Sequence, residues 1–170
     1  MLSIVPILIA MASLIISLYV AYRAWKFNEL STRRASRQAH VQMLFEIDKL
    51  LIQYPELWGI YDTNPLGEKR DSSPLAVARR EAFLYQHFNI FYVVHDYYMN
   101  IITRDKADDD NWKSWETYLK QLFIQSTEAR RLFKESRSQE IYTRQFRDVV
   151  NGILAEVERS ECPTNTSTVQ

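Results

Sequence analysis

The chain has 170 residues, and its 21 Lys and Arg residues are balanced by 21 Asp and Glu residues. A nucleic-acid-binding domain normally carries a basic excess, so this balance argues against nucleic acid as a partner. With only three Gly and five Pro residues among many Leu, Tyr, Phe, Glu and Arg residues, the composition predicts an all-α fold.

An uncharged apolar run occupies the start of the chain. No charged side chain occurs between Leu2 and Tyr22. Because a bilayer core is crossed by roughly 20 apolar residues of helix, we predict a transmembrane anchor over residues 1–24. A cleaved signal peptide is the alternative. It would carry a basic n-region, a shorter apolar core and a small-residue cleavage site, and the anchor is the favoured interpretation because this segment has none of these.

Basic and aromatic residues follow the predicted anchor. Lys and Arg close to a span resist translocation, so the N-terminus is predicted to lie outside and the remainder of the chain in the cytoplasm. Tyr and Trp at this depth are typical of a membrane interface. The sequence therefore predicts a single-pass protein of the inner (plasma) membrane, in contact with the lipid bilayer. The predicted membrane-interface residues are Tyr19, Tyr22, Arg23, Trp25, Lys26, Arg33, Arg34 and Arg37.

Residues 25–38 are predicted to form a basic juxtamembrane stalk without a helix breaker. The basic side chains of the stalk would be attracted to an anionic leaflet, but their role in setting the membrane topology is enough to account for them. Within the anchor, Ser13, Ser17 and Ala21 recur every four residues. Small residues at this spacing would let two helices pack closely as a homodimer, but Ser and Ala are common in spans that do not dimerise, and that interpretation is favoured.

Residues 39–159 are predicted to form a cytosolic helical domain. Apolar residues at three- and four-residue spacing continue the helix until Pro55, which predicts a kink or stop near Tyr54. Ser73-Pro74 predicts the start of a long aromatic helix that reaches about residue 103 and lies at the centre of the domain. On this helix we expect Phe88 and Phe91 to be buried, and Arg79 and Arg80 to contribute little to stability.

Further helices are predicted from capping signals. A late Asp or Asn in the polar segment 104–111 is expected to cap one helix, and Ser126 or Thr127 to start a short one. The segment Ser136–Gln139 has the form of a capping box and is expected to begin the last long helix. Residues 160–170 are predicted to be a disordered tail. The whole domain is predicted to be an antiparallel bundle of about four helices.

No constellation of reactive residues stands out. His87 and His95 have no Glu three residues before them, as a bundle metal motif would require. The acidic stretch 105–116 lacks an EF-hand ligand at Ala107 and the required Gly at Asp110. We therefore predict no catalytic residues, no cofactor and no metal, and no enzymatic activity.

The layout of one N-terminal span, a basic stalk, the segment Pro55–Trp58 and a Trp112–Trp115 helix resembles uncharacterised small bacterial single-pass membrane proteins with a cytosolic helical domain. This resemblance implies no activity and no functional residues. The leading hypothesis is a membrane-anchored helical module that binds another protein at the inner membrane face. The alternative is a membrane-tethered sensor or enzyme domain with a small-molecule pocket. The predicted pocket residues are Tyr85, Tyr92, His95 and Asp96.

Overall fold

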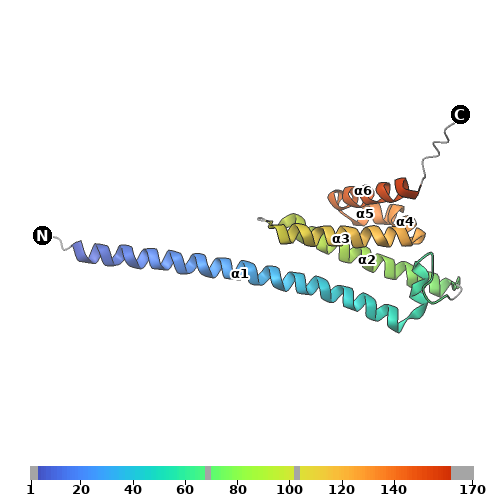
Figure 1. Cartoon of the computed structure of the whole chain (residues 1–170), viewed down its shortest axis with the longest axis horizontal. Coiled ribbons are helices and arrows are strands. Elements are labelled where there is room, and N and C mark those ends of the chain that lie inside the picture. The colour runs from blue at the N-terminus through green and yellow to red at the C-terminus, as the bar shows by residue number, and fades with distance from the viewer. Residues whose placement is uncertain (1–3, 68–69, 102–103, 162–170) are drawn as a thin grey trace, which may run out of the picture. The chain divides into compact units, whose positions relative to one another are not determined.

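The structure is a computed structural model in which every regular element of the described residues is a helix (Figure 1). The described residues are 4–67, 70–101 and 104–161, with the backbone alone at 136–138. For these residues the predicted all-α class is confirmed. The chain divides into two compact units, Met1–Phe45 and Glu46–Gln170.

The longest helix, α1, runs from Ile4 to Gln53 and is followed by the 3-10 helix η1 (Pro55–Ile60). Pro55 has no backbone N–H with which to extend α1, and it occupies the first turn of η1, where that group is not needed. The predicted stop near Tyr54 is therefore confirmed. Near the end of α1, Ile47 and Leu51 are buried.

Helix α2 (Pro74–Asn100) begins as its sequence predicts. The Ser73 hydroxyl accepts a hydrogen bond from the backbone N–H of Ala76 at 3.3 Å, and Pro74 occupies the first turn. The helix packs against η1, α3 and α6. It supplies a large share of the core of the second unit, namely Phe83, Leu84, Phe88, Ile90, Phe91, Val94 and Tyr98.

Helix α3 (Lys106–Gln125) begins earlier than the sequence predicts. Its cap is Asp105, whose carboxylate accepts from the N–H of Asp108 at 2.8 Å, while the Asp108 carboxylate accepts from the N–H of Asp105 at 3.2 Å. The expectation of a late Asp or Asn cap is thus wrong, because this reciprocal pair satisfies two N–H groups together. For α4 (Thr127–Lys134) the cap is Ser126, as expected.

The last long helix, α6 (Arg144–Glu161), starts eight residues later than predicted, because a separate helix α5 (Ser136–Ile141) precedes it. Between the two helices, Tyr142 is buried and its ring stacks on Phe133. The hydroxyl of Tyr142 donates to Asn89 at 2.9 Å. Tyr142 is therefore held in the core at the point where α5 has ended and α6 has not yet begun.

Two predictions near the C-terminus fall on residues that are not described. The side chains of the capping box expected at Ser136–Gln139 belong partly to 136–138, and most of the predicted tail lies in 162–170. The first two tail residues, Ser160 and Glu161, are helical and end α6.

Candidate functional site

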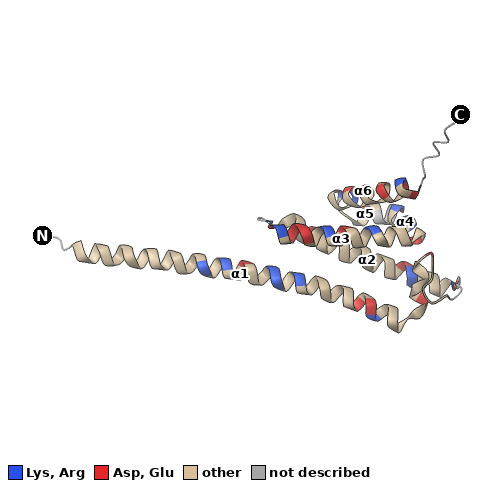
Figure 2. Ribbon diagram, viewed as in Figure 1, with Lys and Arg blue, Asp and Glu red and all other residues tan. Residues whose placement is uncertain are grey.

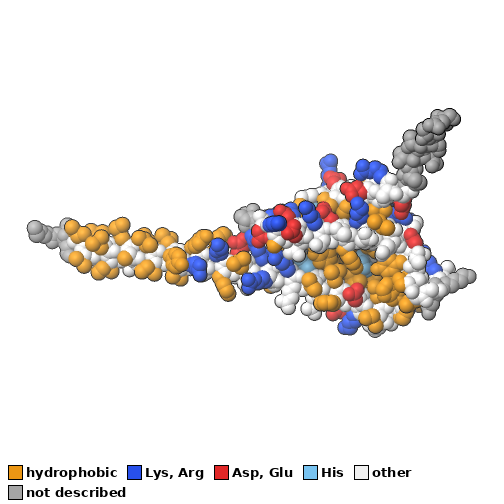
Figure 3. Space-filling view, in the orientation of Figure 1, with side chains coloured by type: hydrophobic (Ala, Val, Ile, Leu, Met, Phe, Trp, Pro, Cys, Tyr) orange, Lys and Arg blue, Asp and Glu red, His pale blue; other side chains and the backbone are white. Residues whose placement is uncertain are grey.

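The apolar part of α1 has no protein covering. Its most apolar stretch, near the N-terminus, is long and apolar enough to cross a membrane, and none of it is buried. Side chains on every side of this stretch are exposed, from 55% at Tyr22 to 68% at Ile4. In Figure 3 apolar side chains cover this length of α1 until the first basic residues.

All eight predicted membrane-interface residues lie on α1, where the basic ones follow the apolar stretch directly (Figure 2). The rings of Tyr22 and Trp25 are neighbours, with centroids 6.3 Å apart. Arg33 pairs with Glu29 at 2.5 Å, one turn earlier. These contacts are local and belong to a continuous helix.

The small residues of the apolar stretch also make a local contact. The hydroxyl of Ser17 donates to the backbone carbonyl of Ser13 at 2.8 Å. Such back-bonding satisfies a Ser hydroxyl inside its own helix. The contact is compatible with a helix in lipid, and the predicted homodimer through Ser13, Ser17 and Ala21 stays a prediction.

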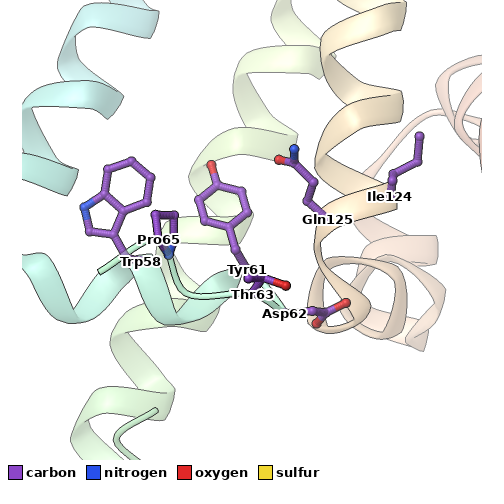
Figure 4. A pocket seen from close by; sticks show the side chains of 7 residues that line it. All are labelled: Trp58, Tyr61, Asp62, Thr63, Pro65, Ile124 and Gln125. Atoms are coloured by element: carbon purple, nitrogen blue, oxygen red, sulfur yellow. The ribbon is translucent and has the colours of Figure 1, made fainter. Parts of the chain in front are cut away.

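A cleft of about 440 Å³ lies in the second unit, between η1 with the segment after it and the end of α3. Trp58, Tyr61 and Pro65 form one side, and Gln125 of α3 extends toward them (Figure 4), while Ile124 also lines the cleft. The rings of Trp58 and Tyr61 are 5.7 Å apart and tilted by 40°. The sequence indicated aromatic residues here but not that they meet α3.

Hydrogen bonds between distant parts of the chain hold the two sides of the cleft together. The Asp62 carboxylate accepts from the Thr127 N–H at 3.0 Å and from the Thr127 hydroxyl at 2.7 Å. The backbone N–H of Asp62 donates to the carbonyl of Gln125 at 2.8 Å. The Ser126 hydroxyl donates to the carbonyl of Ile60 at 2.6 Å. These bonds fix the segment after η1 against the junction of α3 and α4.

Two tyrosine hydroxyls near the cleft stay protonated at neutral pH. Burial raises the pKa of Tyr61, and the Asp48 carboxylate raises it further. Burial raises the pKa of Tyr118 to about 12, with added contributions from Tyr61 and Asp48. The cleft therefore presents the neutral hydroxyl of Tyr61, the amide of Gln125 and the carboxylate of Asp62 beside its aromatic rings, a surface suited to an apolar side chain and a peptide backbone.

A buried ion pair joins the first part of α2 to α4. Arg80 is only 2% exposed, and its Nη1 donates to the backbone carbonyl of Asp71 at 2.7 Å. Its Nε lies 3.6 Å from the Glu128 carboxylate, which also pairs with Arg70. The expectation that Arg80 contributes little to stability presumed a surface position, and the burial of Arg80 contradicts that position. Arg79 is exposed and pairs with Glu56 at 2.8 Å.

The four residues of the alternative pocket do not share one environment. The ring of Tyr92 packs on Tyr142 and Phe146, and that of His95 on Trp112 and Phe146. Asp96 is exposed and pairs with Asn100. The ring of Tyr85 packs on Phe88, which lies one turn further along the same helix. Rings of neighbouring helices thus pack against Tyr92 and His95.

The described residues contain no group of three His, Cys, Asp or Glu side chains that could hold a metal ion. Comparisons with protein-family models, with curated proteins and with solved structures gave no match to this chain. The candidate sites therefore stand on the residues of this chain alone: the exposed apolar stretch of α1 and the aromatic cleft beside η1.

Proposed function

We propose that this chain is a single-pass membrane-anchored helical module that binds another protein at the inner face of the membrane. The observation that carries the anchor is the exposure of every side of the apolar stretch of α1. Soluble monomers rarely expose contiguous apolar patches of more than a few hundred Å². Lipid provides an apolar environment for such a surface, and an α-helix satisfies its backbone hydrogen bonds within that lipid.

The module on the cytoplasmic side is an antiparallel bundle of about four helices. In support, α3 packs against α2, α4 and α6, and α2 also contacts α6. The aromatic cleft formed by Trp58, Tyr61 and Pro65 is the surface we assign to the partner. It receives an apolar side chain of the partner against the faces of these rings, while Gln125 offers hydrogen bonds to the partner's backbone.

Extraction from membranes tests the anchor. The full chain should stay with the membrane fraction after treatment with alkaline carbonate, and a fragment beginning at Ser36 should be released. Leu14→Arg together with Ile15→Arg should reduce membrane retention, because charges near the centre of a span oppose insertion. Quantitative release of the unmodified full chain by carbonate would contradict the anchor.

Thiol labelling in intact cells tests the orientation. Cys162 should resist a membrane-impermeant thiol reagent, and a reporter fused after Gln170 should behave as cytoplasmic. As the matched control, a chain carrying Cys162→Ser and Ser3→Cys should be labelled from outside. Labelling of Cys162 but not of the introduced thiol would reverse the orientation.

Site-specific crosslinking tests the partner surface. A photo-reactive residue in place of Trp58 should capture a discrete protein in cells, whereas the same residue at exposed Lys113 should not. Tyr61→Ala in the chain carrying the probe at Trp58 should weaken the capture, because it removes an aromatic ring that lines the cleft. Equal capture from Trp58 and Lys113 would exclude the cleft as the specific surface.

A further inference from the structure

The basic residues of the stalk share one side of α1. Because the helix is continuous through residues 23–37, the direction of each side chain follows from ~100° of rotation per residue. On this basis five side chains fall within an arc of about 100°. This arc is the basic stripe, and it consists of Arg23, Lys26, Arg33, Arg34 and Arg37, of which Arg33 also pairs with Glu29.

The opposite side of the same turns carries no charge, since Asn28, Thr32 and Ala35 occupy it. Membrane topology depends on the number of Lys and Arg residues close to the span, and their direction around the helix does not enter. Topology thus explains why the stalk is basic, but it does not explain why the charge is one-sided. A one-sided arrangement suits contact with an extended anionic surface.

Apolar side chains lie among the charges of the stripe. Phe27 and Leu30 are 75% and 45% exposed, and they line a surface groove together with Tyr19, Arg23 and Lys26. At a bilayer interface, apolar and aromatic groups enter the boundary of the acyl chains while Lys and Arg extend toward the phosphates. The composition of the groove matches this division.

The length of the stripe requires the helix to tilt. Arg37 is 14 residues beyond Arg23, or about 21 Å along the helix axis. Electrostatic attraction to a surface falls off over about 8 Å at physiological salt, so an upright helix would leave Arg37 out of reach. Spans tilt by up to about 40°, which lowers the height of Arg37 above Arg23 from about 21 Å to about 16 Å, and on the stripe side the long Arg side chain covers part of the remaining distance to the headgroups.

We propose that the basic stripe binds the phosphates of anionic phospholipids in the cytoplasmic leaflet and sets the direction in which α1 tilts. Arg is suited to this role because its guanidinium group can make paired hydrogen bonds with a phosphate. The proposal rests on the proposed membrane anchor and adds to it a lipid class and a binding surface.

Lipid enrichment around the full chain tests the proposal. The chain is reconstituted into phosphatidylcholine vesicles containing a minor share of phosphatidylglycerol, bilayer patches are excised with a styrene–maleic acid copolymer, and their headgroups are quantified. A redistributed variant with the same composition and net charge is the matched control. It carries Thr32→Arg, Arg33→Thr, Arg34→Ala, Ala35→Arg, Ser36→Arg and Arg37→Ser.

The unmodified chain should enrich phosphatidylglycerol by about twofold or more over the bulk lipid, and about 1 M NaCl should abolish the enrichment. The redistributed variant should lose most of it. A second variant with Arg23→Gln and Lys26→Gln should also lose enrichment, which guards against a folding defect in the first.

Equal enrichment by the unmodified and redistributed chains would overturn the stripe, because charge number alone would then suffice. No enrichment by the unmodified chain, with normal insertion into the vesicles, would overturn the stripe and leave the anchor standing. Failure to insert into pure phosphatidylcholine vesicles would overturn the anchor. Loss of enrichment on adding inorganic phosphate at constant ionic strength would overturn the assignment to lipid in favour of free phosphate.

Discussion

The apolar stretch of α1 and the helix α2 are both long and rich in apolar residues, yet one is exposed on all sides and the other buries 11 of its 27 residues. Their side chains differ in kind. The α1 stretch is aliphatic and uncharged up to Tyr22, whereas α2 contains many aromatic rings together with Arg, Glu, His and Asp. Protein interiors can hold charges and rings whose partners are specific, while lipid favours aliphatic side chains without charge.

The largest expected contrast between the two helices concerns an apolar side chain in each. In the full chain in non-ionic detergent, Phe88→Ala should lower the free energy of unfolding by about 3–5 kcal/mol, because Phe88 is fully buried against Phe123 and Phe133. Leu14→Ala should change it by about 0.5 kcal/mol or less, because no protein atoms cover that part of α1. Urea titration followed by Trp fluorescence measures both. Equal losses would show that α2 is peripheral.

The second prediction concerns charge, which α2 carries and the apolar stretch lacks. Arg80→Ala should cost about 3 kcal/mol or more, because it leaves the buried carboxylate of Glu128 with one cation fewer. Arg79→Ala should cost about 0.5 kcal/mol or less, since its pair with Glu56 is at the surface. The same urea titration compares the two. Equal small losses would mean that the buried cluster adds nothing to stability.

The third prediction uses the buried imidazole of α2. Burial lowers the pKa of His87 from 6.5 to about 4, although its hydrogen bond to the Phe83 carbonyl and the charge of Asp48 oppose this. Between these two values the unfolded chain binds a proton that the folded chain does not. Stability attributable to His87 is therefore complete above pH 6.5 and is lost as the pH falls toward 4, by about 3 kcal/mol at most.

The check is a comparison of urea midpoints at pH 7 and pH 4 in His87→Leu and in the unmodified chain. The variant should lose less stability over this interval, whatever its stability at pH 7. An identical acid loss in both chains would assign the effect to other groups.

The smallest expected effect is at the start of α2. Ser73→Ala should cost about 1 kcal/mol, because the N–H of Ala76 loses its acceptor, and Ser73→Thr should restore most of the loss, because its hydroxyl can both accept from Ala76 and donate to Asp71. Hydrogen exchange of the first turn of α2 resolves a change of this size. Unchanged protection in Ser73→Ala would show that the cap contributes nothing to the first turn.

Features with local causes were predictable from the sequence. The end of α1 before Pro55 and the start of α2 at Ser73-Pro74 each depend on residues within one turn. The start of α3 was missed although its cause is also local: both Asp105 and a later Asp or Asn could serve as cap, and the reciprocal bond with Asp108 decides between them.

Features that join distant segments were not predictable. Arg80 was expected to contribute little to stability because its partner Glu128 is 48 positions away and gives no local signal. The aromatic cleft depends on the bonds of Asp62 to Thr127, 65 residues apart. No periodicity or capping signal carries such information, since it arises only when helices pack.

Ser126 illustrates how packing restricts the amino acids that a position can accept. Its hydroxyl both donates to the Ile60 carbonyl and accepts from the Ala129 N–H, and it is fully buried. Asp or Asn would cap α4, but an ionised Asp has no proton for Ile60 and a bulkier Asn must fit the same space. Thr alone offers the same donor and acceptor. The exposed hydroxyl of Ser73 donates to the Asp71 carboxylate, for which water can substitute, so Asn and Thr are both acceptable there. Among variants selected for folding, position 126 should therefore vary less than position 73.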